Sequence, residues 1–171
     1  MSLPDYFAFY GIDQSFHPDP AELRKRFYEK SREFHPDRAQ TGNEEAADDA
    51  LKMSALNNEA YRTLGNPDKL VAYILKLHGV IEENEQYKLP SAFLMEMMEL
   101  NESINEADEN ENSFNEAQVV FENAMNDLKM AANPLLERFD QGDRSEELLA
   151  ALKDFYYRKK YLQRISERLG S

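Results

Sequence analysis

The stretch PAELRKRFYEKSREFHPDR, residues 20–38, decides the fold. Four of its residues are spaced so that they lie on one side of a helix, which would be the buried side: Leu23, Phe27, Ser31 and Phe34. Asp19 can cap such a helix, and Pro20 suits its first position. Pro36 ends the helix, because proline has no amide proton for the helical hydrogen bonds. The stretch therefore predicts an amphipathic helix that runs up to a proline-stiffened loop.

The outward side of this predicted helix is basic. Between Ala21 and Phe34 there are five basic residues against three acidic ones, and Arg24, Lys25 and Arg32 fall away from the apolar stripe. Such a face is either ordinary solvated surface or a docking surface for an acidic partner.

The loop after this helix begins with His35, Pro36 and Asp37. Pro36 disfavours the helical conformation for the residue before it, so the chain leaves the helix in a fixed direction. Asp37 is therefore predicted to be displayed to solvent, where a stiffly held carboxylate suits an arginine of a partner protein. His35 has a second interpretation, as an imidazole that caps the end of the helix.

Further helices are predicted on both sides of this hairpin. A second long helix spans about 44–64, and Asn57 falls on its buried face, so this amide either has a buried hydrogen-bond partner or lies at the margin. Residues 5–10 form a short aromatic segment, and residues 68–78 form another helix. The polar and acidic segment 80–90 holds little that could be buried, which makes it the predicted domain boundary.

Three more helical patterns complete the chain, at 91–107, from about 113, and at about 145–169. The inward positions of the first are Phe93, Met97, Leu100, Ile104 and Ala107. Ser113 has capping-box spacing at the start of the second, and Pro134 should kink that helix or split off its last turn. Because the connections are short, the patterns predict an antiparallel three-helix bundle.

The helix at 91–107 also carries apolar side chains outside its inward face. At 100° per residue they share an outer arc with a row of carboxylates, and this arc holds Leu94, Met95, Met98, Glu99, Glu102 and Glu106. An exposed apolar cluster rimmed with charge is typical of protein-binding surfaces, and methionine adapts to uneven partners. Tyr157 on the last helix is a candidate aromatic anchor. The alternative is that these side chains pack on the N-terminal domain.

Composition excludes several classes of function. The chain has no cysteine, so disulfides, thiolate metal ligands and a cysteine nucleophile are absent. A net charge of −13 argues against broad binding of nucleic acid, since phosphate contacts need clustered lysine and arginine. The stretch from Ile81 to Asp127 contains thirteen acidic residues and only one lysine. This acidic stretch is either a second docking surface or a set of solvated helix faces.

No signal for catalysis, a metal, a cofactor or a membrane is found in the sequence. His17 and His78 have no second ligand-type neighbour, and there is no glycine-rich phosphate loop or nucleophile elbow. The carboxylates fall on predicted exposed faces, where their pKa values should stay ordinary. No run of eighteen apolar residues and no signal segment occurs. A soluble, cytoplasmic protein without catalytic residues is expected.

The N-terminal pattern resembles the J-domain. The resemblance rests on the order of the aromatic opening at 5–7, the basic helix, the loop tripeptide, Asn58-Glu59-Ala60-Tyr61 and Asn66-Pro67. It implies that the tripeptide docks on a DnaK-type chaperone and triggers its ATP hydrolysis. The implied chaperone-binding residues are His35, Pro36 and Asp37, supported by Arg24, Lys25 and Arg32, with Lys30 and Arg38 as further candidates.

With the acidic bundle added, the whole chain resembles the HscB family, the J-domain co-chaperones of iron–sulfur cluster assembly. The resemblance rests also on Leu77-His78-Gly79 and on the run from Ala92 to Glu96. It implies an all-α fold with a J-domain at 1–79, a linker at 80–90 and a client-binding three-helix bundle at 91–171. The implied partners are an HscA-like chaperone of the DnaK type and an IscU-like scaffold protein. The implied scaffold contacts are Leu94, Met95, Met98, Glu99, Glu102, Glu106 and Tyr157.

Two departures from the family pattern and one alternative function remain. Asn57 stands where an apolar residue is usual, and the metal-binding cysteine extension of some eukaryotic members is missing from this sequence, which implies a bacterial-type, metal-free member. The alternative function is a J-domain adaptor that recruits an unrelated client protein to a DnaK-type chaperone.

Overall fold

A computed structural model of the chain describes residues 3–35, 43–107 and 111–170. The chain divides after Gly79 into two compact units. Every regular element in the described ranges is a helix, so the predicted all-α fold is confirmed. The helices are α1 (Tyr6–Tyr10), α2 (Pro20–Glu33), α3 (Glu44–Leu64), α4 (Pro67–Leu77), α5 (Ser91–Ala107), α6 (Glu111–Asp140) and α7 (Glu146–Gly170).

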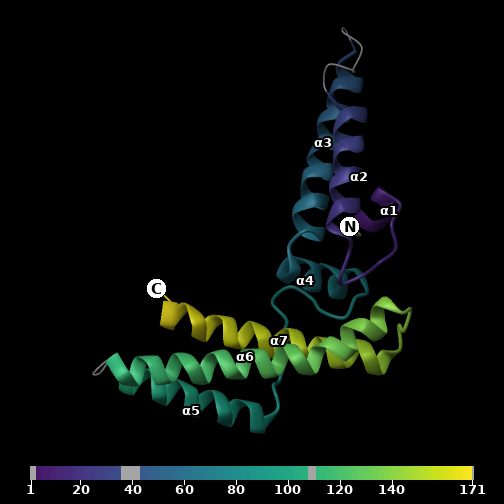
Figure 1. Cartoon of the computed structure of the whole chain (residues 1–171). Helices are drawn as coiled ribbons and strands as arrows, with labels where there is room; N and C mark the ends of the chain where they lie inside the picture. Colours follow the sequence, from purple (N-terminus) through teal and green to yellow (C-terminus); the bar gives the residue numbers. More distant parts are fainter. Residues whose placement is uncertain (1–2, 36–42, 108–110, 171) are drawn as a thin grey trace. The chain divides into compact units, whose positions relative to one another are not determined.

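The first unit is built on a helical hairpin. Helices α2 and α3 run side by side, α1 packs against α2, and α4 follows α3 directly (Figure 1). Side chains cap the starts of two of these helices: Asp19, as predicted, accepts from the amide of Ala21, and Asn66, whose capping role was not predicted, accepts from two amides of α4. Gly79 lies just beyond α4 with a φ of 69°, a left-handed conformation that favours glycine.

Asn57 is buried at the centre of this unit and is fully bonded. Its side-chain oxygen accepts from the hydroxyl of Tyr10 at 2.7 Å, and its amide donates to the carbonyl of Phe27 and to the hydroxyl of Ser31, both at 3.1 Å. Burial raises the pKa of Tyr10, so this hydroxyl stays a donor. Of the two sequence interpretations, a buried partner or a marginal position, the first is confirmed. One amide thus joins α1, α2 and α3.

We expect Asn57→Ala to destabilise the first unit by about 2–3 kcal/mol, because the change removes three side-chain hydrogen bonds in a buried place. Hydrogen exchange of the α2 and α3 amides in the full chain measures this loss locally. Asn58→Ala is the matched control, since Asn58 is the exposed neighbour on the same helix. Equal effects of the two substitutions would contradict the role given to Asn57.

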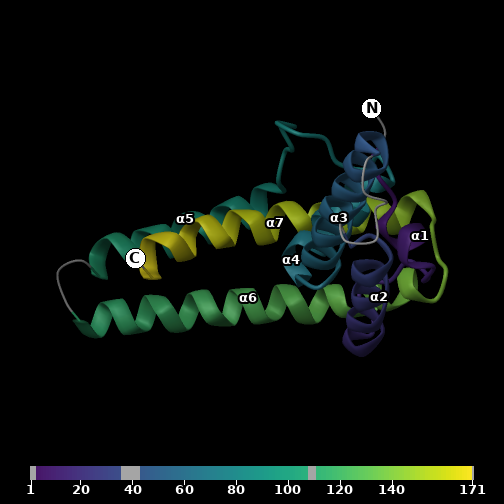
Figure 2. The ribbon, with the colours of Figure 1, turned by 90° about the horizontal axis from the view of Figure 1, so that it is seen from above.

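The second unit contains the predicted three-helix bundle. Helices α5, α6 and α7 lie lengthwise along one another in two views (Figure 1 and Figure 2), and each contacts the other two. The core holds Phe93, Met97, Leu100, Ile104, Ala117, Leu162 and Ile165. The four large inward residues predicted for α5 are all among them, which confirms the predicted face at these positions; the side chain of the fifth, Ala107, lies outside the described residues. No helix in the described ranges has the length and apolar character that a bilayer crossing requires.

One prediction about α6 was wrong, and one of the two alternatives predicted for Pro134 is ruled out. The helix already begins at Glu111, so Ser113 lies within it and is not its N-cap. The helix also continues past Pro134 to Asp140 without splitting off a last turn. Beyond it, Asp143 accepts from the amide of Ser145 and pairs with Arg138 at 2.8 Å; these contacts lower the pKa of Asp143 to about 2.

The segment 80–90 belongs to the second unit and is not an unpacked linker. Ile81 is buried, and the ring of Tyr87 stacks on the ring of Tyr157 with centroids 4.7 Å apart. Glu85 accepts from the ammonium of Lys153 at 2.5 Å and from the hydroxyl of Tyr157 at 2.8 Å. Ile81 is the one buried residue of this segment, as its polar composition predicted, but the contacts with α7 were not predicted. We call Glu85, Tyr87, Lys153 and Tyr157 the α7 clasp.

Because of the α7 clasp, the free energy of unfolding should depend on pH. Hydrogen bonds from Lys153 and Tyr157 lower the pKa of Glu85 from its ordinary 4.5, so its contribution is present above that pH and is lost as the pH falls through the lower folded value. We expect wild type to be more stable than Glu85→Gln in urea at pH 7 and the difference to vanish at low pH.

Glu83→Gln serves as the control for this experiment, because Glu83 is exposed in the same segment. It should follow wild type at every pH. A difference between wild type and Glu85→Gln that grows on acidification would have the opposite sign and would refute the assignment.

Candidate protein-binding surfaces

The first candidate surface is the basic side of α2. Arg24, Lys25 and Arg32 are all exposed, as predicted. No described carboxylate lies within ion-pair distance of any of these three, whereas Arg26 pairs with Glu22 at 2.9 Å. None of the described carboxylates therefore neutralises these three charges.

Lys30 differs from the other basic residues of α2. Its ammonium lies over the ring of Phe9 at 5.1 Å and over the ring of Phe34 at 5.7 Å, and Glu33 lies 3.4 Å away. These contacts hold Lys30 against the aromatic side chains next to the end of α2. Lys30 therefore has contacts inside the first unit. The sequence pattern did not reveal these contacts.

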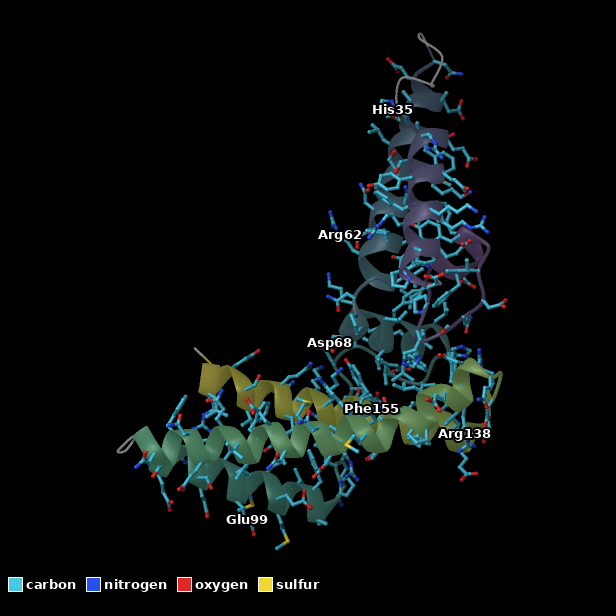
Figure 3. The ribbon with its side chains drawn as sticks, in the orientation of Figure 1. His35, Arg62, Asp68, Glu99, Arg138 and Phe155 are labelled. Atoms are coloured by element: carbon cyan, nitrogen blue, oxygen red, sulfur yellow. The ribbon has the colours of Figure 1, made fainter. Side chains whose placement is uncertain are left out.

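His35 is exposed at the end of the hairpin remote from α4 (Figure 3). Phe34, not His35, occupies the C-cap position, where its amide bonds to the carbonyl of Lys30 at 2.9 Å. The basic side of α2 therefore leads directly to His35. Pro36 and Asp37, like Arg38, lie outside the described residues, so the display of Asp37 stays a prediction.

The second candidate surface is the outer side of α5. Met95 and Met98 are 64% and 61% exposed, although Met97 between them is buried in the core. Glu99, Glu102 and Glu106 are exposed beside them, and Figure 3 shows Glu99 on the outer side of the helix. Leu94 is only half-buried, so it contributes part of its side chain. Two large, adaptable apolar groups next to three carboxylates suit a protein partner that has both apolar and basic side chains.

Tyr157 does not lie free as an aromatic anchor. Its ring stacks on Tyr87 and its hydroxyl donates to Glu85, both within the α7 clasp. Burial, followed by the hydrogen bond to this carboxylate, raises the pKa of Tyr157. The sequence pattern placed Tyr157 on a helix correctly, but its partners lie about seventy residues away along the chain and left no signal in the local spacing.

Metal chemistry finds no support in the described residues. Within 3–35, 43–107 and 111–170, no three histidine, aspartate or glutamate side chains lie close enough together to hold an ion. The two surfaces described above offer charge and, on α5, exposed apolar side chains, which is the chemistry of candidate protein-binding surfaces.

Comparison with known proteins places these features in a family context. The family described as HSCB C-terminal oligomerisation domain matches residues 89–170. The iron–sulfur cluster co-chaperone protein HscB of Homo sapiens is 31% identical over 152 residues, which cover 88% of this chain and 64% of that relative. The chain thus spans somewhat less than two thirds of the length of this human protein.

Two solved structures are similar in fold to nearly the whole of this chain. The crystal structure of the human co-chaperone protein HscB aligns with a TM-score of 0.74 at 30% identity, covering 98% of this chain and 81% of that one. The chaperone HscB from Vibrio cholerae aligns with a TM-score of 0.70 at 23% identity, covering 97% and 95%. Both are similar in fold through the two units, and the human structure is similar in sequence as well.

Proposed function

Because the chain belongs to the HscB family of iron–sulfur cluster co-chaperones, we propose that it stimulates ATP hydrolysis by an HscA-like chaperone of the DnaK type and delivers an IscU-like scaffold protein to it. In this proposal the ATP chemistry belongs to the chaperone. This chain contributes two binding surfaces and no catalytic residue.

The first unit is the proposed chaperone-binding part. Arg24, Lys25 and Arg32 offer three positive charges that no described carboxylate neutralises, on the helix that leads to His35. Electrostatic docking of this kind raises the association rate and weakens with added salt. The chain's overall charge of −13 makes this local positive surface distinctive.

The second unit is the proposed scaffold-binding part, and one observation carries this assignment. Met95 and Met98 remain largely exposed on a helix whose opposite side forms the core of the bundle. Most of the surface of these two methionines is exposed to solvent, and a partner that covers them gains the burial of apolar area.

The proposal is tested by a single-turnover ATPase assay with purified chaperone, with this chain, and with or without the scaffold protein. Stimulation by this chain alone and a further increase with scaffold are expected. Stimulation without any effect or binding of the scaffold would instead favour the adaptor that recruits an unrelated client. No stimulation under either condition would refute the proposal.

A further inference from the structure

Helix α5 carries two neighbouring ridges on its outer side. At a spacing of four, three and four residues, side chains line up along a helix. The first ridge is Met95, Glu99, Glu102 and Glu106, and the second is Leu94, Met98, Asn101 and Asn105. Only the apolar and acidic members enter the function proposed above. The two asparagines have had no role so far.

These asparagines are bound by an arginine of α7. One terminal nitrogen of Arg168 donates to the side-chain oxygen of Asn101 at 2.8 Å, and the other donates to that of Asn105 at 2.7 Å. A guanidinium is thereby held beside the second ridge, at a place where α5 and α7 meet. The arrangement explains Arg168 structurally, as a link between two helices that also suits the negative end of α7.

A notch of about 250 Å³ opens at the same place. Its lining residues are Asn101, Tyr161, Arg164, Ile165 and Arg168. Ile165 is buried and belongs to the core, so the notch has an apolar floor. The tyrosine ring adds apolar wall, and the two guanidiniums with the asparagine amide supply the polar edge. A small polar group attached to an apolar stem fits this combination.

Arg164 has no structural explanation of the kind found for Arg168. It is exposed, and neither it nor Arg168 lies within ion-pair distance of a carboxylate in the described ranges. The guanidinium fork matches the two oxygens of a carboxylate, so an exposed arginine on the edge of the notch favours an acidic occupant.

We propose that this notch binds an aspartate or glutamate side chain of the scaffold protein, with Arg164 as the residue that selects it; this inference rests on the function proposed above. Asn101 follows Met98 by one turn on the same ridge, so the carboxylate enters beside the apolar contact. The glutamates of the first ridge require basic partner groups on the opposite edge. A surface with positive charge along one edge and negative charge along the other admits a partner in one orientation.

The test is the affinity of the full chain for the scaffold, measured by titration calorimetry with Arg164→Gln. This substitution keeps a polar side chain and removes the charge and the guanidinium fork. We expect roughly a tenfold weaker complex and a shallower dependence of affinity on salt. Lys129→Gln is the matched control, because it removes one charge from an exposed position on α6 and should change the affinity less than about twofold.

A double-mutant cycle identifies the partner group. Surface aspartates and glutamates of the scaffold are changed to alanine one at a time, and each change is measured against wild type and against Arg164→Gln. The residue in the notch is the one whose loss weakens the wild-type complex but has no further effect on the Arg164→Gln complex. Such a residue supports the proposal. If none of the surface aspartates and glutamates of the scaffold behaves in this way, the proposal is overturned.

The failure of this inference is distinguishable from failure of the proposed function. If wild type binds the scaffold and Arg164→Gln binds it equally well, the notch is not used although the function stands. Equal losses for Arg164→Gln and Lys129→Gln mean a general charge effect and also overturn the inference. If wild type does not bind the scaffold at all, the function itself fails.

Discussion

Asp37→Asn is expected to reduce stimulation of the chaperone ATPase to the basal rate. The substitution keeps the size and shape of the side chain and removes only its charge. The arginine-binding role implied for the loop tripeptide depends on that charge, because a charge-assisted bidentate pair is lost and a neutral amide replaces one of its oxygens with a donor. The rate of a single ATP turnover measures the effect directly.

Two controls separate function from folding in this experiment. Helicity and thermal stability of Asp37→Asn should stay close to those of wild type, since Pro36 still fixes the backbone. Asp49→Asn removes a carboxylate from an exposed position on α3 and should stimulate normally. If Asp37→Asn unfolds the first unit, the residue is structural and the proposed docking contact is wrong.

The double substitution Met95→Ala and Met98→Ala should weaken scaffold binding by about 10- to 100-fold, since exposed apolar anchors that become buried in an interface commonly contribute about 1–3 kcal/mol together. Binding of the chaperone in the absence of scaffold should not change. Calorimetry with the scaffold and the basal ATPase assay together measure both activities. Leu94 is left intact, because it is half-buried and its truncation would also disturb packing.

Met130→Ala is the matched control for the methionine pair. Met130 is 69% exposed on α6, so it offers the same kind of side chain at a similar exposure elsewhere in the bundle. It should bind scaffold like wild type. A similar loss from Met130→Ala would show that general surface hydrophobicity, and not the outer side of α5, determines the affinity.

Helical periodicity predicted the bundle core well because the information is local. Phe93, Met97, Leu100 and Ile104 are buried as their spacing required, since apolar residues at positions three and four apart must share one side of a helix. The same argument placed Met95 and Met98 outside. Sequence spacing thus sufficed to find one candidate surface before any tertiary contact was known.

The features that sequence analysis missed depend on contacts between distant residues. The segment 80–90 is polar, and its partners Lys153 and Tyr157 lie 68 and 72 residues from Glu85, a distance at which periodicity carries no information. Local rules also misjudged Ser113: its capping spacing is genuine, but the helix extends beyond it. The sequence correctly identified Asn57 as a polar residue on a buried helix face. Only the structure shows which atoms form hydrogen bonds with its side chain.

The α7 clasp determines at which residue a stable fragment of the second unit should begin. The matched family region starts at residue 89, so a truncation there would discard Ile81, Glu85 and Tyr87. Lys153 and the hydroxyl of Tyr157 would then lose their hydrogen-bond acceptor, and one tyrosine ring would lose its neighbour. A fragment prepared for crystallisation or calorimetry should therefore start at Val80, ten residues upstream of Pro90.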